Sequence, residues 1–249
     1  MKLYLIRHAE SANNAILATN GDESGRVPDP EITEIGHQQA RHLGDHLAHP
    51  EGDSRQPSFA DGRQGAQNYG LTHLYCSLMT RSILTAEYIA GACNLPLFAH
   101  LDIFERGGIY DVEADGSSTG LPGPGRSYFA ERFPNLVVPA SVGEAGWYAR
   151  PAETDAQFVA RTDKALRDIV GRHKDTDDSV AMVVHGDFID QAVNGLLGLS
   201  RGTENYRTAW MGNWAAHNTS ITRFDLLAGA KVVVYTNRLD HLGVDLVTW

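Results

Sequence analysis

The sequence predicts an α/β fold, a three-layer α/β/α sandwich with a mostly parallel central sheet and an inserted cap region. Short apolar runs alternate with amphipathic helical patterns along the chain, and helices that cross between strands make neighbouring strands parallel. A stretch punctuated by glycine and proline over residues 106–151 indicates the insertion. The chain has 249 residues, 42% of them hydrophobic, which is enough for one large domain over residues 1–249.

Four apolar runs are candidate strands. Residues 3–6 form a short run that breaks into polar residues, as a fully buried strand does. Residues 180–184 form a strong candidate, residues 232–235 another, and residues 71–76 a weaker one.

Two helices are predicted from side-chain spacing. The first carries an apolar stripe at spacings of four and three, formed by Met79, Ile83, Ala86, Ala90 and Cys93. The second covers residues 158–170, and Thr154 with Gln157 just before it has the spacing of a capping box.

Two stretches interrupt this alternation. Residues 49–70 are rich in Gly, Ser, Gln and Asp and are expected to form a long surface loop. Residues 106–151 are a candidate substrate cover. The alternative is that they form a surface insertion with no role at the site. Their aromatic residues either line a site or anchor the insertion to the body, and we expect anchoring for at least half of Tyr128, Phe129, Trp147 and Tyr148.

Composition excludes several classes of protein. Lys and Arg total 21 against 31 Asp and Glu, a formal charge of −10, which argues against nucleic acid or an anionic membrane as the main partner. No apolar run approaches the roughly 20 residues of a membrane span, and the first run is too short for a signal peptide. The two cysteines, Cys76 and Cys93, provide neither a disulfide framework nor a multi-cysteine zinc site. We expect a cytoplasmic protein.

Charged and polar residues follow three of the candidate strands. Arg7 and His8 end the first run, and His185 and Gly186 end the run at 180–184. Ligands of open α/β sheets bind at the carboxyl ends of strands. A buried arginine there is costly unless it meets an anion, and a phosphate fits the guanidinium fork.

The next helix would begin near Asp187, which could cap it and leave N–H groups for an anion. A third strand end lies at Ser77, where a helix begins whose first turn carries Arg81. One strand-end histidine alone is more often structural, but three such ends together predict a pocket for a phosphoryl group. One histidine can act as nucleophile while the other groups stabilise the charge on the transferring oxygens.

The sequence argues against two other site chemistries. No His-Glu-x-x-His pattern occurs, and two arginines beside the histidines would repel a metal dication. The Gly-x-Gly-x-x-Gly turn of dinucleotide-binding oxidoreductases is missing after the first strand.

At these residues the sequence resembles the histidine phosphatase superfamily, or phosphoglycerate mutase-like family, in its first branch. Its Arg-His-Gly-Glu-x-x-x-Asn signature is similar to Arg7-His8-Ala9-Glu10 with Asn14. Further segments of the family pattern resemble residues 29–40, residues 77–86 with Ser77, Arg81 and Thr85, His185-Gly186, residues 218–220, and Asn237 with His241 and Leu242.

The resemblance implies a role for each matched residue. His8 would be the nucleophile that forms phosphohistidine, and Arg7, Arg81 and His185 would hold the phosphate oxygens. Glu105 occupies the place of the acid that gives a proton to the leaving oxygen, and it would need a raised pKa. Asn14 and Gly186 would also contact phosphate, whereas Asp29 and Thr33 would shape the loop and cap the following helix. No metal or organic cofactor is implied.

Departures from the family pattern are few. Ala9 replaces the usual glycine and would be strained only at positive φ. Leu78, Met79 and Ser82 replace Pro, Leu and Ala, which are changes of packing.

The resemblance implies a metal-independent phosphomonoester hydrolase whose partners are a small phosphorylated metabolite or inorganic phosphate. A phosphoglycerate mutase is the alternative, but the mutases' Glu-Arg-His-Tyr-Gly stretch is absent, since Gly107-Gly108-Ile109 follow Glu105-Arg106. A catalytically silent phospho-ligand binding module is a further alternative, disfavoured because both histidines and the acid are present. The residues over 102–150 include four arginines against seven acids and give no support for a polyphosphate substrate.

Overall fold

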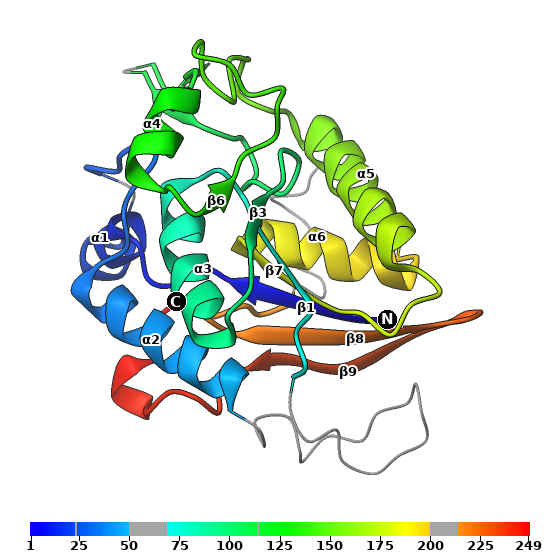
Figure 1. Cartoon of the computed structure of the whole chain (residues 1–249). Helices are drawn as coiled ribbons and strands as arrows, with labels where there is room; N and C mark the ends of the chain where they lie inside the picture. Colours follow the sequence, from blue (N-terminus) through cyan, green and yellow to red (C-terminus); the bar gives the residue numbers. More distant parts are fainter. Residues whose placement is uncertain (23, 50–68, 114, 200–213) are drawn as a thin grey trace.

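The computed structural model describes residues 1–22, 24–49, 69–113, 115–199 and 214–249. Its centre is a seven-stranded sheet of order β6-β3-β2-β7-β1-β8-β9 (Figure 1). The elements in chain order are β1 (Lys2–Arg7), α1 (Ala12–Asn20), α2 (Glu34–Ala48), β2 (His73–Cys76), α3 (Thr80–Cys93), β3 (Leu97–Ala99), β4 (Tyr110–Val112), β5 (Ser118–Gly120), α4 (Arg126–Arg132), β6 (Leu136–Val137), α5 (Asp155–His173), β7 (Ser179–Val184), α6 (Gly186–Leu197), β8 (Ile221–Leu227), β9 (Ala230–Arg238) and the 3-10 turn η1 (Val244–Leu246).

The sheet is mostly parallel, as predicted. Strands β6, β3, β2, β7 and β1 run in one direction, whereas β8 and β9 are antiparallel to their neighbours. The apolar run at 232–235 belongs to β9, which is joined to β8 by a short turn at Ala228 and Gly229 rather than by a helix. A two-residue connection can only pair strands in opposite directions.

Helices cover both faces of the sheet, which gives the three layers (Figure 1). Side chains of β1 alternate between two buried clusters. Leu3 and Leu5 join the cluster that includes residues of α5 and α6, and Tyr4 and Ile6 join the cluster with α2 and α3. Strand β7 is buried along its whole length. The apolar runs at 3–6 and 180–184 are therefore strands covered on both faces.

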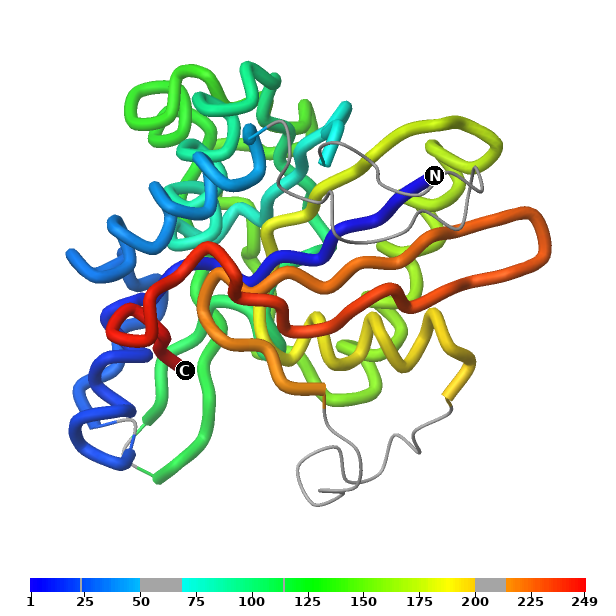
Figure 2. The backbone as a smooth tube through the Cα atoms, turned by 90° about the horizontal axis from the view of Figure 1, so that it is seen from below, coloured from blue at the N-terminus to red at the C-terminus, as the bar shows by residue number. Residues whose placement is uncertain are grey.

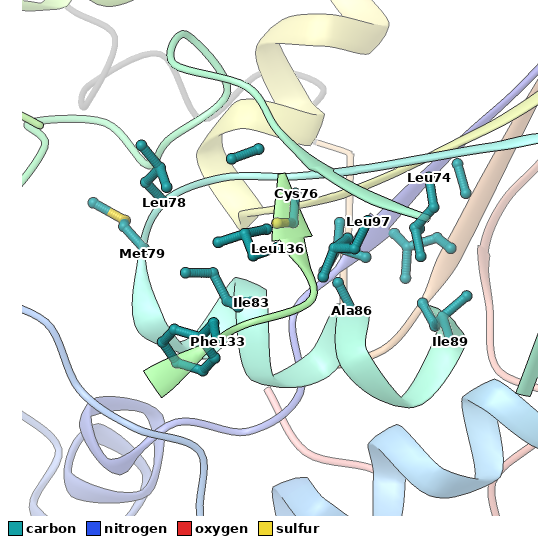
Figure 3. Packing of buried hydrophobic residues seen from close by; sticks show 14 of the residues in the cluster. Leu74, Cys76, Leu78, Met79, Ile83, Ala86, Ile89, Leu97, Phe133 and Leu136 are labelled. Carbon is teal, nitrogen blue, oxygen red and sulfur yellow. The ribbon is translucent and has the colours of Figure 1, made fainter. Parts of the chain in front are cut away.

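Both predicted helices are present. Ile83, Ala86 and Ile89 of α3 pack with Leu74, Cys76 and Leu97 of the sheet (Figure 3). Helix α5 begins after Thr154, whose hydroxyl accepts a hydrogen bond from Gln157 N at 3.3 Å while Gln157 Oε1 accepts one from Thr154 N at 2.9 Å. The capping box is confirmed.

The stretch predicted as an inserted cap, residues 106–151, contains the β4–β5 hairpin, α4 and β6. Strand β6 pairs with β3 at the sheet edge, and Phe133 and Leu136 join the core cluster (Figure 3). Phe129, Trp147 and Tyr148 are buried in the same cluster, with Tyr128 packed against it, so these aromatics anchor the stretch to the body. Its role as a substrate cover stays a prediction. The surface loop predicted at 49–70 lies, except for its ends, outside the described residues.

The C-terminal segment returns to the end of β1. Gln39 Nε2 in α2 donates to Leu246 O and to Thr248 Oγ1, both at 2.8 Å. Asn218 N donates to Thr248 O at 3.1 Å. Figure 2 shows this segment, in red, beside the blue N-terminal helices. Trp249 is thereby held near the carboxyl end of β1.

Among the helices of the described residues, none combines the length and the apolar character that a membrane crossing requires.

Candidate active site

The three predicted strand ends meet at one edge of the sheet. Arg7 pairs with Val184 in the parallel register of β1 and β7, and His8 N donates to Val184 O at 2.9 Å. His8 and His185, one residue beyond each strand, have ring centroids 5.1 Å apart. Ser77 follows β2, the other neighbour of β7, and its hydroxyl lies 2.7 Å from His185 Nε2.

The hydrogen bonds of His8 fix which ring nitrogen carries hydrogen. Nδ1 lies 2.7 Å from Ala9 O, which can only accept, so Nδ1 donates. Nε2 then holds a lone pair and accepts a hydrogen bond from Arg81 Nε at 3.1 Å. Burial, with the charges of Arg81 and Arg7, holds the pKa of His8 well below its ordinary value. His8 is therefore a neutral imidazole whose Nε2 is available as a nucleophile.

The departure at Ala9 causes no strain. Ala9 is not among the described residues with positive φ, and its N–H donates to Thr85 Oγ1 at 2.9 Å. An alanine fits this backbone as well as a glycine would.

Arg81 is placed by Asp29 at the start of α3. The Asp29 carboxylate accepts hydrogen bonds from Thr80 N at 3.0 Å and Thr80 Oγ1 at 2.8 Å, and lies 3.9 Å from Arg81 NH1. Asp29 therefore caps α3 from another part of the chain, whereas the sequence suggested that it caps the helix after it. That helix, α2, is capped by Thr33, as expected.

Arg7 presents an unsatisfied donor at the site. Its NH1 donates to Ala216 O at 2.6 Å, but its buried Nε has no hydrogen-bond partner among the described residues. Burial lowers the pKa of Arg7 to about 10, so the guanidinium stays charged at neutral pH. A buried N–H without an acceptor is costly, and an anionic oxygen would satisfy it.

His185 is also buried and neutral. Burial, with the charge of Arg81, lowers its pKa well below the ordinary value. Its Nε2 is engaged with Ser77 and its Nδ1 has no partner within the described part of the chain.

Glu105 has the properties expected of a proton donor. Its Oε1 accepts a hydrogen bond from Arg106 N at 2.9 Å, and its Oε2 lies 3.4 Å from Asp187 N. Burial and the Asp187 carboxylate raise the pKa of Glu105 to about 7. A carboxyl group with this pKa is half protonated at neutral pH, so it can both give and take a proton.

The backbone before Glu105 is fixed by Arg161, which sequence reasoning missed. Arg161 NH1 donates to Asp102 O at 2.9 Å and to Phe104 O at 3.0 Å, and its guanidinium lies 3.5 Å from the centroid of the Phe104 ring. The charge is balanced by Glu153, which accepts two hydrogen bonds at 2.7 Å.

Asp187 does not cap α6, contrary to the prediction. The helix begins at Gly186, because Ile189 N donates the first helical hydrogen bond to His185 O. His185 is therefore the capping residue, and its side chain makes no capping hydrogen bond. Asp187 instead lies in the first turn, and its Oδ2 is 3.2 Å from Arg106 Nε.

Asn14 and Gly186 both lie at the site, and their contact with phosphate stays a prediction. Asn14 Oδ1 accepts hydrogen bonds from Ser11 N and Oγ in the capping box of α1, so a ligand contact would come from Nδ2. A β-carbon at Gly186 would be 3.6 Å from Arg7 Nε, an ordinary contact. This glycine therefore leaves the edge of the guanidinium open rather than relieving a clash.

A cavity of about 390 Å³ opens over these residues. Arg7, Asn14, Arg81, Glu105 and Gly186 line it, and His8 and His185 are buried next to them, 3% and 0% exposed. The sequence did not point to Leu17, Arg26, Tyr110, Trp214 or Trp249, which also line the cavity. Leu17, three residues after Asn14 on α1, and Tyr110, five residues after Glu105, have positions that could have indicated them.

A larger cavity, of about 910 Å³, lies between α5, α6 and the β8–β9 hairpin. Its described lining residues offer no imidazole, thiol or serine hydroxyl, so the smaller cavity is the candidate active site.

One group of described residues could hold a metal ion. Ligand atoms of His73, His173 and Asp178 lie within 4.8 Å of one another. They already bond to each other and to the protein, with His173 Nδ1 2.9 Å from Asp178 Oδ2 and His173 Nε2 3.0 Å from Tyr75 OH. The group joins the starts of β2 and β7, the opposite ends of these strands from His185, and takes no part in the candidate site.

Comparison with known proteins identifies the family of these residues. The model of the histidine phosphatase superfamily (branch 1) matches residues 3–56 and 116–238. The match includes Arg7, His8, Asn14 and His185 but not residues 57–115, so it is the structure that brings Arg81 and Glu105 to the site. No curated protein matches the chain.

Solved structures with the same fold include several phosphatases. A phosphoserine phosphatase mutant from Entamoeba histolytica, in complex with phosphoserine, is 20% identical over 97% of this chain and 98% of its own, with a TM-score of 0.56. A mycobacterial glucosyl-3-phosphoglycerate phosphatase with VO3 is 16% identical over 95% and 98%, with a TM-score of 0.56. The alpha-ribazole phosphatase from Shigella flexneri is 15% identical over 96% of each chain, with a TM-score of 0.57.

Proposed function

The chain belongs to the histidine phosphatase superfamily, branch 1, and on this premise we propose that it is a phosphomonoester hydrolase that acts through a phosphohistidine on His8. The proposed substrate is a small phosphorylated metabolite. The observation that carries the proposal is the lone pair on His8 Nε2, which meets the guanidinium of Arg81, feels the charge of Arg7 and shares the site with a carboxyl group whose pKa is about 7. The phosphatases among the solved structures support the same reaction class.

In the first step, His8 Nε2 attacks phosphorus and the bond from phosphorus to the ester oxygen breaks. The protonated Glu105 gives its proton to that oxygen, so a neutral alcohol leaves. The lone pair that attacks is the one that accepts the Arg81 Nε hydrogen bond in the free protein. Arg81 must therefore turn this N–H to a phosphate oxygen as the substrate binds.

In the second step, Glu105 takes a proton from water while the water oxygen attacks phosphorus. The bond from phosphorus to Nε2 breaks, inorganic phosphate leaves, and His8 regains its lone pair. Arg7 and Arg81 stabilise the charge on the phosphate oxygens in both steps. Their positive charge does the work that a metal dication does in other phosphatases, so we propose that the reaction requires no metal.

The test is hydrolysis of 4-nitrophenyl phosphate between pH 5 and 8 in EDTA, with the wild-type protein beside His8→Ala. His42→Ala, an exposed histidine of α2, is the matched control. We expect activity in the wild-type and His42→Ala proteins and its loss in His8→Ala. An alkaline quench followed by mass spectrometry should find the phosphoryl group on His8. Turnover that survives in a clean His8→Ala preparation would exclude the proposed nucleophile, and turnover that EDTA abolishes would exclude the metal-free reaction.

A further inference from the structure

The active-site cavity has an aromatic part next to its charged part. Tyr110, Trp214 and Trp249 line the same cavity as Arg7 and Arg81, together with the aliphatic Leu17 and Pro28. Trp249 is 57% exposed and Leu17 41% exposed. Large apolar side chains left open beside a charged centre are typical of a site that binds an apolar ligand group.

Each wall of this part is held in place by its own contacts. Asn13 of α1 holds the Arg26–Pro28 segment through two hydrogen bonds to Val27, at 2.8 and 3.0 Å. Arg26 then donates to Tyr110 O at 3.1 Å and covers the Tyr110 ring at 4.3 Å. These contacts join α1 to β4, so the wall is formed before a ligand arrives.

The two tryptophans are held by contacts with α6 and with His217. Trp214 donates from its backbone N to Asp190 Oδ1 at 2.8 Å and from Nε1 to Asn194 Oδ1 at 3.0 Å, both on α6. The Trp249 ring packs edge-on against His217, with centroids 4.4 Å apart. Both indoles are therefore fixed at one edge. Rigid aromatic rings bind flat partners at a low cost in conformational entropy.

Charge beyond the phosphate-binding groups is balanced. Arg26 and Arg106 line the cavity together with Asp187 and Asp190, and Arg106 is paired with Asp187 and Asp155. An ester with a second anionic group, such as a carboxylate, would find no surplus of positive charge there. The cavity volume of about 390 Å³ is near the small end of ligand pockets, about 300 to 1,000 Å³, and suits a leaving group with one ring system.

We propose that Tyr110, Trp214 and Trp249 form a binding site for an uncharged aromatic leaving group, so that the substrate is a phosphomonoester of a small aromatic alcohol. This inference rests on the proposed function and narrows its substrate class.

The test compares two esters that differ only in the ring. Benzyl phosphate and cyclohexylmethyl phosphate both release a primary alcohol, so a difference in kcat/KM reports the flat ring rather than the ease of leaving. We expect benzyl phosphate to exceed cyclohexylmethyl phosphate by about 3- to 10-fold, as the extra interaction of an aromatic pair predicts. It should exceed phosphoserine and 3-phosphoglycerate, which carry carboxylates, by a larger factor.

Variants assign this preference to the rings. Trp249→Ala should lower the benzyl value about 3- to 10-fold and remove the preference over cyclohexylmethyl phosphate, and Trp249→Phe should retain it. Trp214→Leu removes the second ring while keeping an apolar side chain at this partly buried position, and it should weaken the preference. Val244→Ala, which changes a 91% exposed apolar residue of the same C-terminal segment, is the matched control and should leave the preference unchanged.

Direct binding separates this inference from the proposed function. Benzylphosphonate, which cannot be hydrolysed, is titrated by calorimetry against methylphosphonate in the same proteins. Benzylphosphonate that binds more tightly, with the difference lost in Trp249→Ala, supports the aromatic site even if no ester is turned over. Hydrolysis that favours phosphoserine or 3-phosphoglycerate, or a benzyl preference that persists in both Trp249→Ala and Trp214→Leu, overturns the aromatic site while leaving a hydrolase. Equal binding of the two phosphonates overturns it as well.

Discussion

Glu105→Gln removes the proposed proton donor while keeping its shape. The expected effect follows from the pKa of Glu105, which burial and Asp187 raise from 4.5 to about 7. At pH 7 a carboxyl group with a pKa of 4.5 would be about 0.3% protonated, and one with a pKa of about 7 is about half protonated. The site therefore raises the fraction of enzyme that can give a proton by roughly 150-fold.

The assay measures kcat/KM for benzyl phosphate and 4-nitrophenyl phosphate from pH 5 to 9. An alkoxide leaves poorly without a proton, whereas 4-nitrophenolate is weakly basic and leaves readily. We expect Glu105→Gln to lose about 10² to 10⁴ in kcat/KM on benzyl phosphate, and much less on 4-nitrophenyl phosphate.

The pH dependence gives a second readout. A donor must be protonated, so the wild-type value for benzyl phosphate should fall as the pH rises above about 7, and this fall should be absent in Glu105→Gln. Glu113→Gln, at an exposed position beyond β4, is the matched control. Equal losses on the two esters, or the same alkaline fall in Glu105→Gln, would refute the reasoning.

Three further predictions concern the surrounding residues. Arg81→Ala should lower kcat/KM for 4-nitrophenyl phosphate by about 10²-fold or more, because it removes a donor to the transferring oxygens. Arg81→Lys should retain only part of the wild-type kcat/KM, since lysine lacks the planar fork. An unchanged rate in Arg81→Ala would place Arg81 outside the reaction. Asp29→Ala should lower the free energy of unfolding by about 1 kcal/mol through loss of the α3 cap, measured by urea denaturation, and an unchanged midpoint would contradict the capping role. Because the pKa of Glu105 is higher in the folded than in the unfolded protein, the contribution of Glu105 to wild-type stability should fall as the pH rises from about 4.5 to about 7. The Tm of Glu105→Gln relative to that of the wild type should therefore rise across that window. A difference in Tm that stays constant with pH would contradict the raised pKa.

Much of the sheet could be predicted because strands buried on both faces appear in the sequence as apolar runs. Strand β8 could not, because Arg223 and Asp225 interrupt its run. In the structure these two side chains pair at 2.8 and 3.0 Å and are fully buried. A buried ion pair has the same residue types as a solvated surface, so sequence alone does not distinguish the two.

The positions of the proposed reacting groups could be predicted for a related reason. Because they follow apolar runs, Arg7, His8 and His185 lie at the carboxyl edge of the sheet, independently of the conformation of the loops. The partners of these groups depend on distant segments instead. Asp29 meets Thr80 across 51 residues, and Arg7 meets Ala216 across 209. No local pattern in the sequence marks such pairs.

The hydrogen-bonded register of β1 and β7 has an evolutionary consequence. The two histidines are spaced by backbone pairing, whereas Pro28, Tyr110, Trp214 and Trp249 come from separate segments outside the central sheet. If the proposed site is correct, replacing one of these segments would alter which alcohol fits without moving His8 relative to His185. The proposed substrate preference could then diverge between descendants of this chain by exchange of surface segments, while the proposed chemistry is inherited unchanged.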